Sequence, residues 1–220
     1  MKQPIVNFRD FRINEITKPK YNHILYIIIG WVWHLTTFSL VEKFIPTQNC
    51  FPIHSRLDDI IPFCEWFILP YVLWYFLIIG TLSYFLFYNP QNCKNLMKFI
   101  VLASIMSTII FLIFPNRQDL RPTEFLNNNF CVDLVKYIYS IDTNTNVCPS
   151  MHVAISIGIA YAWIKENSAN LIAKILLIGF CVLVCLSVVF VKQHSIIDIY
   201  VAIPVSAIAI LIGFKSCKNS

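Results

Sequence analysis

Residues 170–191 read NLIAKILLIGFCVLVCLSVVFV, and this stretch decides the fold class of the chain. Lys174 is its only charged residue, and 22 residues at a rise of about 1.5 Å each are long enough to cross the hydrocarbon core of a bilayer. Only helices and closed β-barrels satisfy their backbone polar groups in lipid, and the run lacks the alternation of a barrel strand. The stretch therefore predicts a transmembrane helix.

Five more apolar runs lie before and after it in the sequence. Together the six runs cover roughly residues 23–41, 66–88, 97–115, 151–165, 170–191 and 196–214. They predict an all-α fold, a six-transmembrane-helix bundle in one membrane domain of residues 23–214. A long outer loop, residues 116–150, joins the third and fourth helices, and the expected polar ends are an N-terminal segment, 1–22, and a tail, 215–220.

Composition supports a membrane protein and argues against other classes. Hydrophobic residues make up 57% of the 220 residues and charged residues 13%, against about 45–50% and about 25% in ordinary globular domains. The net charge of +5 is spread in ones and twos between apolar runs. Because no basic stripe forms, we expect no nucleic-acid partner.

The distribution of Lys and Arg predicts the orientation of the chain. If both termini are cytoplasmic, eleven of the basic residues are cytoplasmic and six are on the other side; the six are Lys43, Arg56, Arg117, Arg121, Lys136 and Lys192. This bias favours both termini inside, in a plasma or inner membrane. Residues 1–22 have neither the short basic region nor the small-residue cleavage site of a signal peptide, so we expect the first run to be a retained anchor.

The outer loop contains one helical pattern. Leu134, Tyr137, Ile138 and Ile141 recur at helical spacing and predict a short amphipathic helix. Such a helix lies either on the membrane surface or packed within the loop.

Three segments with polar groups suited to phosphate chemistry fall at the outer ends of the predicted spans. The clearest contains His194 and Asp198, which are four residues apart and so share a helical face. The carboxylate can fix the tautomer of the imidazole and leave its other nitrogen free to attack an electrophile. A carboxylate at the end of a span is costly in lipid, which favours a functional role, although a helix-capping Asp beside an interfacial His is the plain alternative.

The other two segments supply a helix start and a guanidinium. Pro149 and Ser150 are typical of the first turn of a helix, whose free N–H groups bind phosphate, and His152 could donate a proton to a leaving oxygen. Arg121 offers a planar fork matched to two phosphate oxygens. Arg117 and Lys192 are further positive charges nearby; each of these cations could instead bind lipid headgroups or set topology.

The remaining polar and sulfur-bearing residues predict structural roles. His34 should bond a neighbouring helix and His23 should be interfacial; Asp58, Asp59 and Glu65 should cap the second span, with His54 leaving a metal site open as an alternative. The eight cysteines show no zinc spacing and imply no metal. In an oxidising compartment, Cys131 and Cys148 could form a disulfide that braces the outer loop.

The order of these motifs resembles one family. CPSMH at 148–152, HSIID at 194–198 and Arg-Pro at 121–122, on a chain of six spans, are similar to the type 2 phosphatidic acid phosphatase superfamily of membrane lipid phosphatases and phosphotransferases. The resemblance covers about residues 97–214 by motif. Two positions depart from its pattern: Phe114 stands where the first motif usually has Lys, and Val188 stands where the third usually has Arg.

The resemblance implies a function and a role for each residue. His194 would form a phosphohistidine with Asp198 orienting it, His152 would be the general acid, and Ser150 and Arg121 would hold phosphate oxygens. Arg117 and Lys192 could replace the two missing cations. We expect a lipid phosphatase that needs no metal or other cofactor and acts on a lipid phosphate in the bilayer. Two alternatives remain: a phosphotransferase similar to inositol phosphorylceramide and sphingomyelin synthases, which share the missing Arg, or a non-catalytic protein on the same scaffold.

Overall fold

The computed structural model describes residues 3–9, 11–44 and 49–215, so nearly all of the expected tail at 215–220, and Cys217, lie outside the described residues. Six helices form the body of the molecule: α1 (His23–Phe44), α3 (Ile68–Tyr88), α4 (Pro90–Ile113), α6 (Met151–Lys165), α7 (Leu171–Phe190) and α8 (Ile196–Gly213). The expected all-helical fold is confirmed. The helix at 90–113 begins seven residues before the predicted run because Asn89 caps it, accepting a 3.0 Å hydrogen bond from Asn92 N, and Pro90 fits its first turn.

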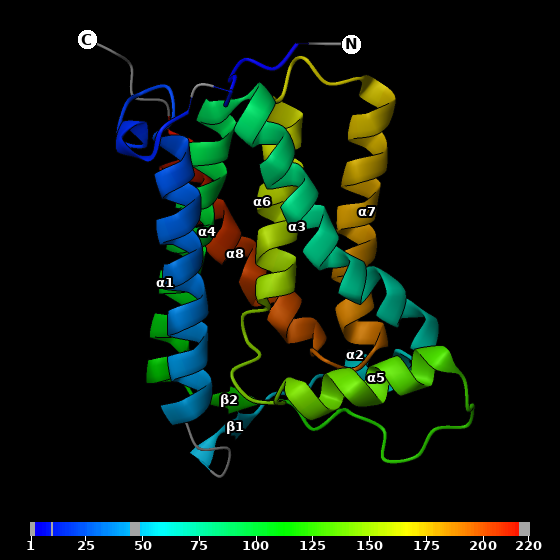
Figure 1. Ribbon diagram of the computed structural model, residues 1–220. Coiled ribbons are helices and arrows are strands. Elements are labelled where there is room, and N and C mark those ends of the chain that lie inside the picture. The colour runs from blue at the N-terminus through cyan, green and yellow to red at the C-terminus, as the bar shows by residue number, and fades with distance from the viewer. Residues whose placement is uncertain (1–2, 10, 45–48, 216–220) are drawn as a thin grey trace.

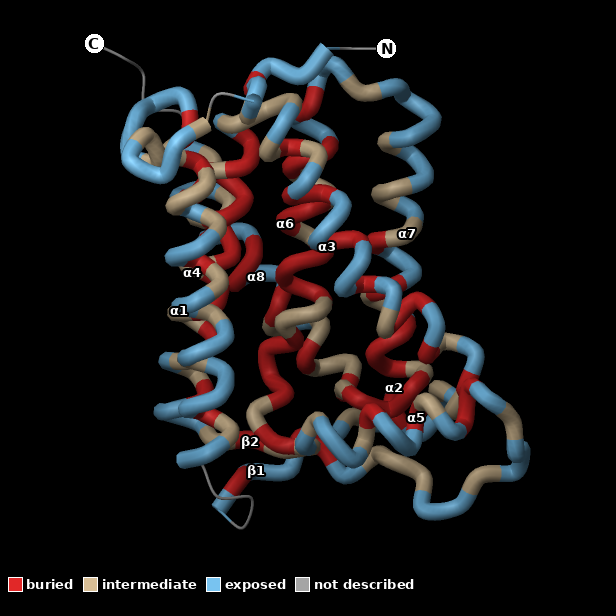
Figure 2. Tube along the Cα trace, viewed as in Figure 1, coloured by how far each residue is buried: buried red, intermediate tan, exposed pale blue. Residues whose placement is uncertain are grey.

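Five of these helices are long and apolar enough to cross a membrane: α1, α4, α7, α8, and α3 together with the 3₁₀ turn η3 (Glu65–Phe67) before it. The fifteen residues of α6 are apolar but shorter than a span. The outer faces of α1 and α7 carry exposed apolar side chains, such as Ile29 and Leu176, and Figure 2 shows both helices pale along their outer sides. These features are compatible with an integral membrane protein.

The helix α4 is central to the packing. It contacts α1, α3, α6 and α8, and α6 in turn packs against α7 and α8 (Figure 1). α4 and α6 approach closely at Gly158, where an added Cβ would lie 2.2 Å from the ring of Phe99. Phe99 is completely buried. A residue without a side chain at 158 therefore lets the two helices meet.

Short elements close one end of the bundle. The strands β1 (Phe51–Pro52) and β2 (Asn116–Arg117) pair in parallel, and α2 (Arg56–Ile60) and α5 (Phe130–Ile141) lie beside them. Figure 1 shows α5 crossing beneath the bundle, whereas the described residues nearest both termini, including the 3₁₀ turn η1 (Ile13–Glu15), lie at the opposite end.

The helix predicted in the outer loop is present, but the face that it buries in the protein coincides only in part with the apolar face read from the sequence. The buried residues of α5 are Cys131, Val132, Val135 and Ile138, whereas Tyr137 and Ile141 are exposed. The cause is that α5 packs against α3 and η3, and this contact selects a face displaced toward the start of the helix.

Candidate functional site

The pair of His194 and Asp198 lies where the chain enters α8. His194 Nδ1 donates a 3.0 Å hydrogen bond to Asp198 Oδ2, as the spacing predicts, and the same oxygen accepts a 3.1 Å bond from Ser195 N. The helix begins two residues later than His194, so the imidazole projects from the loop before α8 and the carboxylate from its first turn. This contact fixes the proton on Nδ1 and leaves Nε2 available to another partner.

The short helix α2 holds this loop in place. Asp58 is buried; its Oδ1 accepts a 2.8 Å bond from Ile196 N, and its Oδ2 accepts a 2.6 Å bond from the Ser195 hydroxyl. Lys192 Nζ donates to the backbone carbonyls of Asp58, at 2.7 Å, and Ile61, at 2.5 Å. The expected capping of the second span is wrong, because α3 has no side-chain cap and Asp58 instead caps α2. Asp58 also anchors the start of α8, which the sequence did not reveal.

His152 lies in the first turn of α6 and faces the same region. Its ring is stacked on Tyr71 at 4.3 Å between centroids and lies 4.1 Å from the ring of Trp74. The ring centroids of His152 and His194 are 6.2 Å apart. His152 Nε2 is buried, and no hydrogen-bond partner for it occurs among the described residues. The imidazole in the first turn of α6 and the imidazole in the loop before α8 therefore converge.

Ser150 occupies the N-cap position of α6. Its hydroxyl is buried, makes no capping bond and has no partner in the part of the chain described, while its backbone N–H donates a 3.3 Å bond to Asp198 O. Asn116 fixes the approach to this turn, because its Oδ1 accepts bonds from Val147 N at 2.9 Å and Cys148 N at 2.8 Å. Burial, and then the carboxylate of Asp198, raise the pKa of the Cys148 thiol.

The predicted cations are placed elsewhere. Arg121 donates to three backbone carbonyls, those of Tyr139 at 3.1 Å, Asp142 at 2.8 Å and Thr143 at 2.9 Å, and its guanidinium lies over the ring of Tyr139. Burial lowers the pKa of Arg121. Arg117 Nε donates a 3.1 Å bond to Asp119.

Arg121 and Lys192 thus support the backbone at this end of the molecule, whereas Arg117 pairs with a carboxylate. The structure brings together His152, His194, Asp198 and Ser150, but it does not bring the three cations to them.

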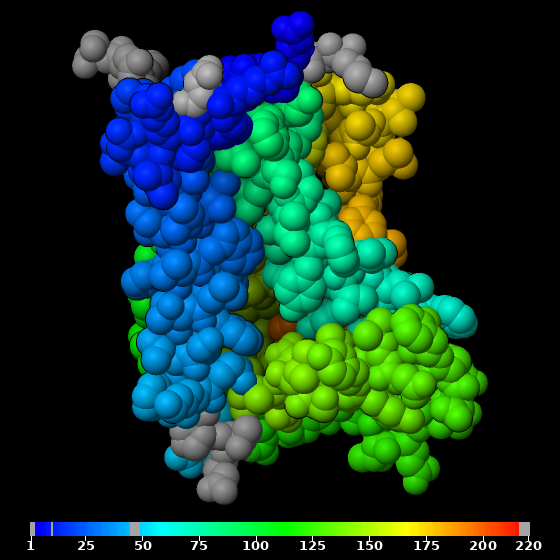
Figure 3. Space-filling model, in the orientation of Figure 1, coloured from blue at the N-terminus to red at the C-terminus, as the bar shows by residue number. Residues whose placement is uncertain are grey.

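The two histidines line a cavity of about 250 Å³. Its walls come from α1, α3, α5 and the loops before α6 and α8, and Figure 3 shows a hollow between α1 and α3, above α5. Two carboxylates, Glu42 and Asp142, line it as well. Burial raises the pKa of Asp142, and His194, Tyr71 and Arg121 oppose that shift. The sequence patterns revealed neither, although an acidic residue directly after the first apolar run, 23–41, was a signal for Glu42.

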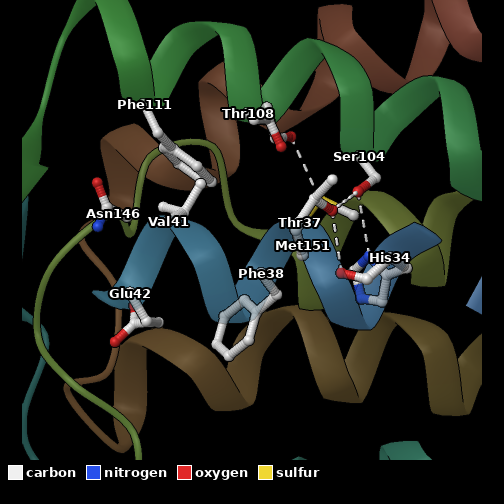
Figure 4. Close-up of a pocket in the computed structure, with 11 residues that line it drawn as sticks. His34, Thr37, Phe38, Val41, Glu42, Ser104, Thr108, Phe111, Asn146 and Met151 are labelled. Atoms are coloured by element: carbon white, nitrogen blue, oxygen red, sulfur yellow. Dashed lines mark hydrogen bonds between the residues drawn. The ribbon is translucent and has the colours of Figure 1, made fainter. Parts of the chain in front are cut away.

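A smaller cavity of about 20 Å³ adjoins this site (Figure 4). His34 Nδ1 lies 3.2 Å from the Ser104 hydroxyl, which also contacts the Thr37 hydroxyl at 3.3 Å. The expected bond from His34 to a neighbouring helix is therefore present, and it joins α1 to α4. Ser107 donates a 3.2 Å bond to the sulfur of Met151 and thereby joins α4 to the start of α6.

The remaining candidates have separate structural partners. His54 pairs with Asp59 at 2.8 Å on the surface, whereas Glu65 accepts bonds from Asn127 and Asn129. Over residues 3–9, 11–44 and 49–215, no three His, Cys, Asp or Glu side chains form a metal-binding group. Cys131 and Cys148 are buried free thiols, so the disulfide considered from the sequence is absent from the structure.

Comparisons with other proteins do not place the chain in a family. No protein-family model, no curated protein and no solved structure matches it.

Proposed function

We propose that the protein is an integral membrane phosphatase that hydrolyses a phosphomonoester or a diphosphate of a lipid, with His194 as the nucleophile. The observation that carries the proposal is the convergence of two histidine rings, 6.2 Å apart, in one cavity, with one ring held by a buried carboxylate. Such a nucleophile, oriented by a third group and faced by a second acid–base residue, is the arrangement required for covalent phosphoryl transfer.

The two histidines can divide the reaction between them. His194 Nε2 attacks phosphorus and forms a P–N bond while the P–O bond to the leaving oxygen breaks. A protonated His152 gives its proton to that oxygen, which departs as an alcohol or, from a diphosphate, as the lipid monophosphate. Water then attacks phosphorus, His152 takes its proton, and the P–N bond breaks to release inorganic phosphate. Both imidazoles return to their starting forms.

The start of α6 would hold the transferring phosphoryl group. The first N–H groups of a helix lack intrahelical acceptors and bind anions, and the Ser150 hydroxyl has no partner among the described residues. In the described conformation, Arg121, Arg117 and Lys192 bind elsewhere. Phosphate binding in this proposal therefore depends on α6, Ser150 and the imidazoles, and the roles suggested for the three cations stay predictions.

The membrane arrangement belongs to the same proposal. We place α6 as a sixth, short span enclosed by its neighbours, with both termini cytoplasmic and the α5 end outside, as the distribution of basic residues favours. The hollow between α1 and α3 would then open sideways, so that a lipid could bring its phosphate to His194 while its chains remain in the bilayer.

The experiment is a phosphate-release assay of the purified full chain. The substrates are phosphatidate, phosphatidylglycerophosphate, a polyprenyl diphosphate and a sphingolipid phosphate. We expect release from at least one, and loss of that release in His194→Ala. His54→Ala is the matched control, because His54 is exposed and does not line the cavity. Full activity of His194→Ala on every substrate would refute the mechanism; release from none would support a non-catalytic protein.

A phosphotransferase is the second candidate, and one observation favours it. Val188 is fully buried in an apolar cluster, so the third motif carries no cation at that position, as in the synthases that the sequence resembles. Labelled lipid phosphate supplied with candidate alcohols separates the two reactions. Label in inorganic phosphate indicates hydrolysis, and label in a new lipid indicates transfer.

A further inference from the structure

The charge of the main cavity does not match a simple phosphate. Among the described residues, its lining includes Glu42 and Asp142 but neither Lys nor Arg. The guanidinium of Arg121, which opposes the rise in the pKa of Asp142, is bonded to the carbonyls of Asp142 and Thr143 and does not line the cavity. A phosphate alone would lie beside two acidic groups without a fixed cation facing it, which is unfavourable at low dielectric.

The two carboxylates are neighbours, although they are one hundred positions apart in the sequence. Glu42 Oε2 accepts a 2.6 Å bond from the hydroxyl of Thr143, the residue that follows Asp142. Asp142 Oδ2 accepts bonds from the Tyr71 hydroxyl at 3.1 Å and from Gln193 Nε2 at 3.2 Å. In each carboxylate, the other oxygen has no hydrogen-bond partner within the described residues. One acceptor from each therefore remains for a ligand.

Aromatic rings complete the walls of the cavity. Trp31 and Phe38 come from α1, and Trp74 and Tyr75 come from α3. The faces of such rings attract cations, above all when water is excluded, and aromatic walls with carboxylates are suited to ammonium groups. His152 is half-buried, its Nε2 is buried and has no hydrogen-bond partner among the described residues, and it lines the same cavity, so it marks the side at which the phosphate would bind.

The acidic pair is also close to the proposed nucleophile. Gln193 directly precedes His194 and donates to Asp142. An ammonium group held by Asp142 would therefore share the cavity with a phosphate at His194.

We propose that the cavity takes a lipid phosphate that carries an ammonium group close to the phosphate, with Glu42, Asp142 and the aromatic rings binding the ammonium. The placement of the phosphate rests on the proposed function, whereas the ammonium site does not. For the phosphatase, the ammonium belongs to the leaving alcohol, as in a sphingoid base 1-phosphate; for the phosphotransferase candidate, it belongs to the headgroup of a diester, as in phosphatidylethanolamine.

The first test compares matched substrates with the purified full chain. One arm sets sphingoid base 1-phosphate against ceramide 1-phosphate, in which acylation removes the positive charge. The other sets phosphatidylethanolamine against phosphatidylglycerol. We expect kcat/KM for P–O cleavage to favour the charged member of one pair by about tenfold or more, as charge-assisted contacts of this kind allow. The preferred pair identifies the source of the ammonium, and equal rates within both pairs would overturn the proposal.

Variants then test the residues. Glu42→Gln and Asp142→Asn remove one charge each, and we expect either to reduce the preference about tenfold. Asp133→Asn is the matched control, because Asp133 is exposed on α5 and does not line the cavity; it should keep the preference. A preference unchanged in both cavity variants would contradict the assignment.

A binding measurement separates this inference from the proposed function. Phosphocholine and glycerol phosphate are titrated into the full chain and into His194→Ala while tryptophan fluorescence is followed. We expect phosphocholine to bind more tightly to both, and Glu42→Gln to weaken that binding. Binding without cleavage of any lipid would keep the ammonium site and refute the hydrolysis. Cleavage of a lipid phosphate, with equal binding of phosphocholine and glycerol phosphate, would keep the hydrolysis and refute the ammonium site.

Discussion

Among single residues, Asp142 makes a prediction about stability and pH. Its pKa is raised from the ordinary value of 3.8, mainly by burial, so the folded protein holds this proton more tightly than the unfolded chain does. The stabilisation from that proton is full below the unfolded pKa and is lost as the pH rises through the folded pKa.

Asp142→Asn, which cannot ionise, should therefore have a higher Tm than the parent at neutral pH, and the difference should shrink toward pH 4. Thermal unfolding followed with a thiol-reactive dye suits this test because several cysteines are buried. A difference that grows as the pH falls would contradict the shift.

A second prediction for single residues concerns the support of the nucleophile. Asp58→Ala leaves the Ser195 hydroxyl and the Ile196 N–H without their acceptor, which costs about 1–3 kcal/mol of unfolding free energy. We expect reduced phosphate release as well, because His194 precedes Ser195. Asp59→Ala, one residue away and exposed, is the control and should change both quantities little. Equal effects of the two variants would show that Asp58 does not anchor the loop.

The sequence indicated much of the candidate site, and its failures have a common cause. His194 with Asp198, and Ser150 with His152, are local patterns, so spacing along one helix was enough to pair them. Glu42 and Asp142 meet through Thr143, a contact between distant segments that no local pattern reveals. Arg121 was assigned to phosphate from its type, whereas the carbonyls at the end of α5 bind it in the structure.

At the level of the helices, close packing of α4 and α6 gives the sharpest expectation. Gly158→Ala would place a Cβ 2.2 Å from the ring of the fully buried Phe99, and overpacking of this kind costs about 1–3 kcal/mol. Gly80→Ala, in α3, meets nothing within 4 Å and should be neutral or slightly stabilising. Thermal unfolding of the two variants in the same detergent checks this. A Tm for Gly158→Ala at or above that of Gly80→Ala would contradict the packing.

The helices themselves were largely predictable, because a long run of apolar residues indicates a helix without information from the rest of the chain. The expected runs at 23–41 and 170–191 correspond to α1 and α7 within a few residues. The buried face of α5 was not predictable, because it depends on contacts with η3 and α3 and not on the pattern of α5 alone. The expected run at 151–165 already has the short length of α6, but hydropathy could not reveal that this helix packs against four neighbours, α3, α4, α7 and α8.

For the whole molecule, the proposed orientation predicts opposite labelling of its two ends. Glu124 lies in the loop before α5 and Asn167 lies between α6 and α7, and both are exposed. In sealed cells, Glu124→Cys should react with a membrane-impermeant thiol reagent, and Asn167→Cys should react only after the membrane is permeabilised. The parent chain measures background from its native cysteines. Labelling of both positions from the same side would exclude the proposed arrangement.

The proposed mechanism as a whole predicts one covalent species. The full chain is mixed with a lipid phosphate that it hydrolyses, quenched in alkali to preserve a P–N bond, digested and examined by mass spectrometry. We expect phosphate on the peptide that contains His194, and none on that peptide from His194→Ala. Rapid release of inorganic phosphate with no phosphohistidine at 194, or with the phosphate on another residue, would contradict a mechanism in which two converging imidazoles transfer the phosphoryl group.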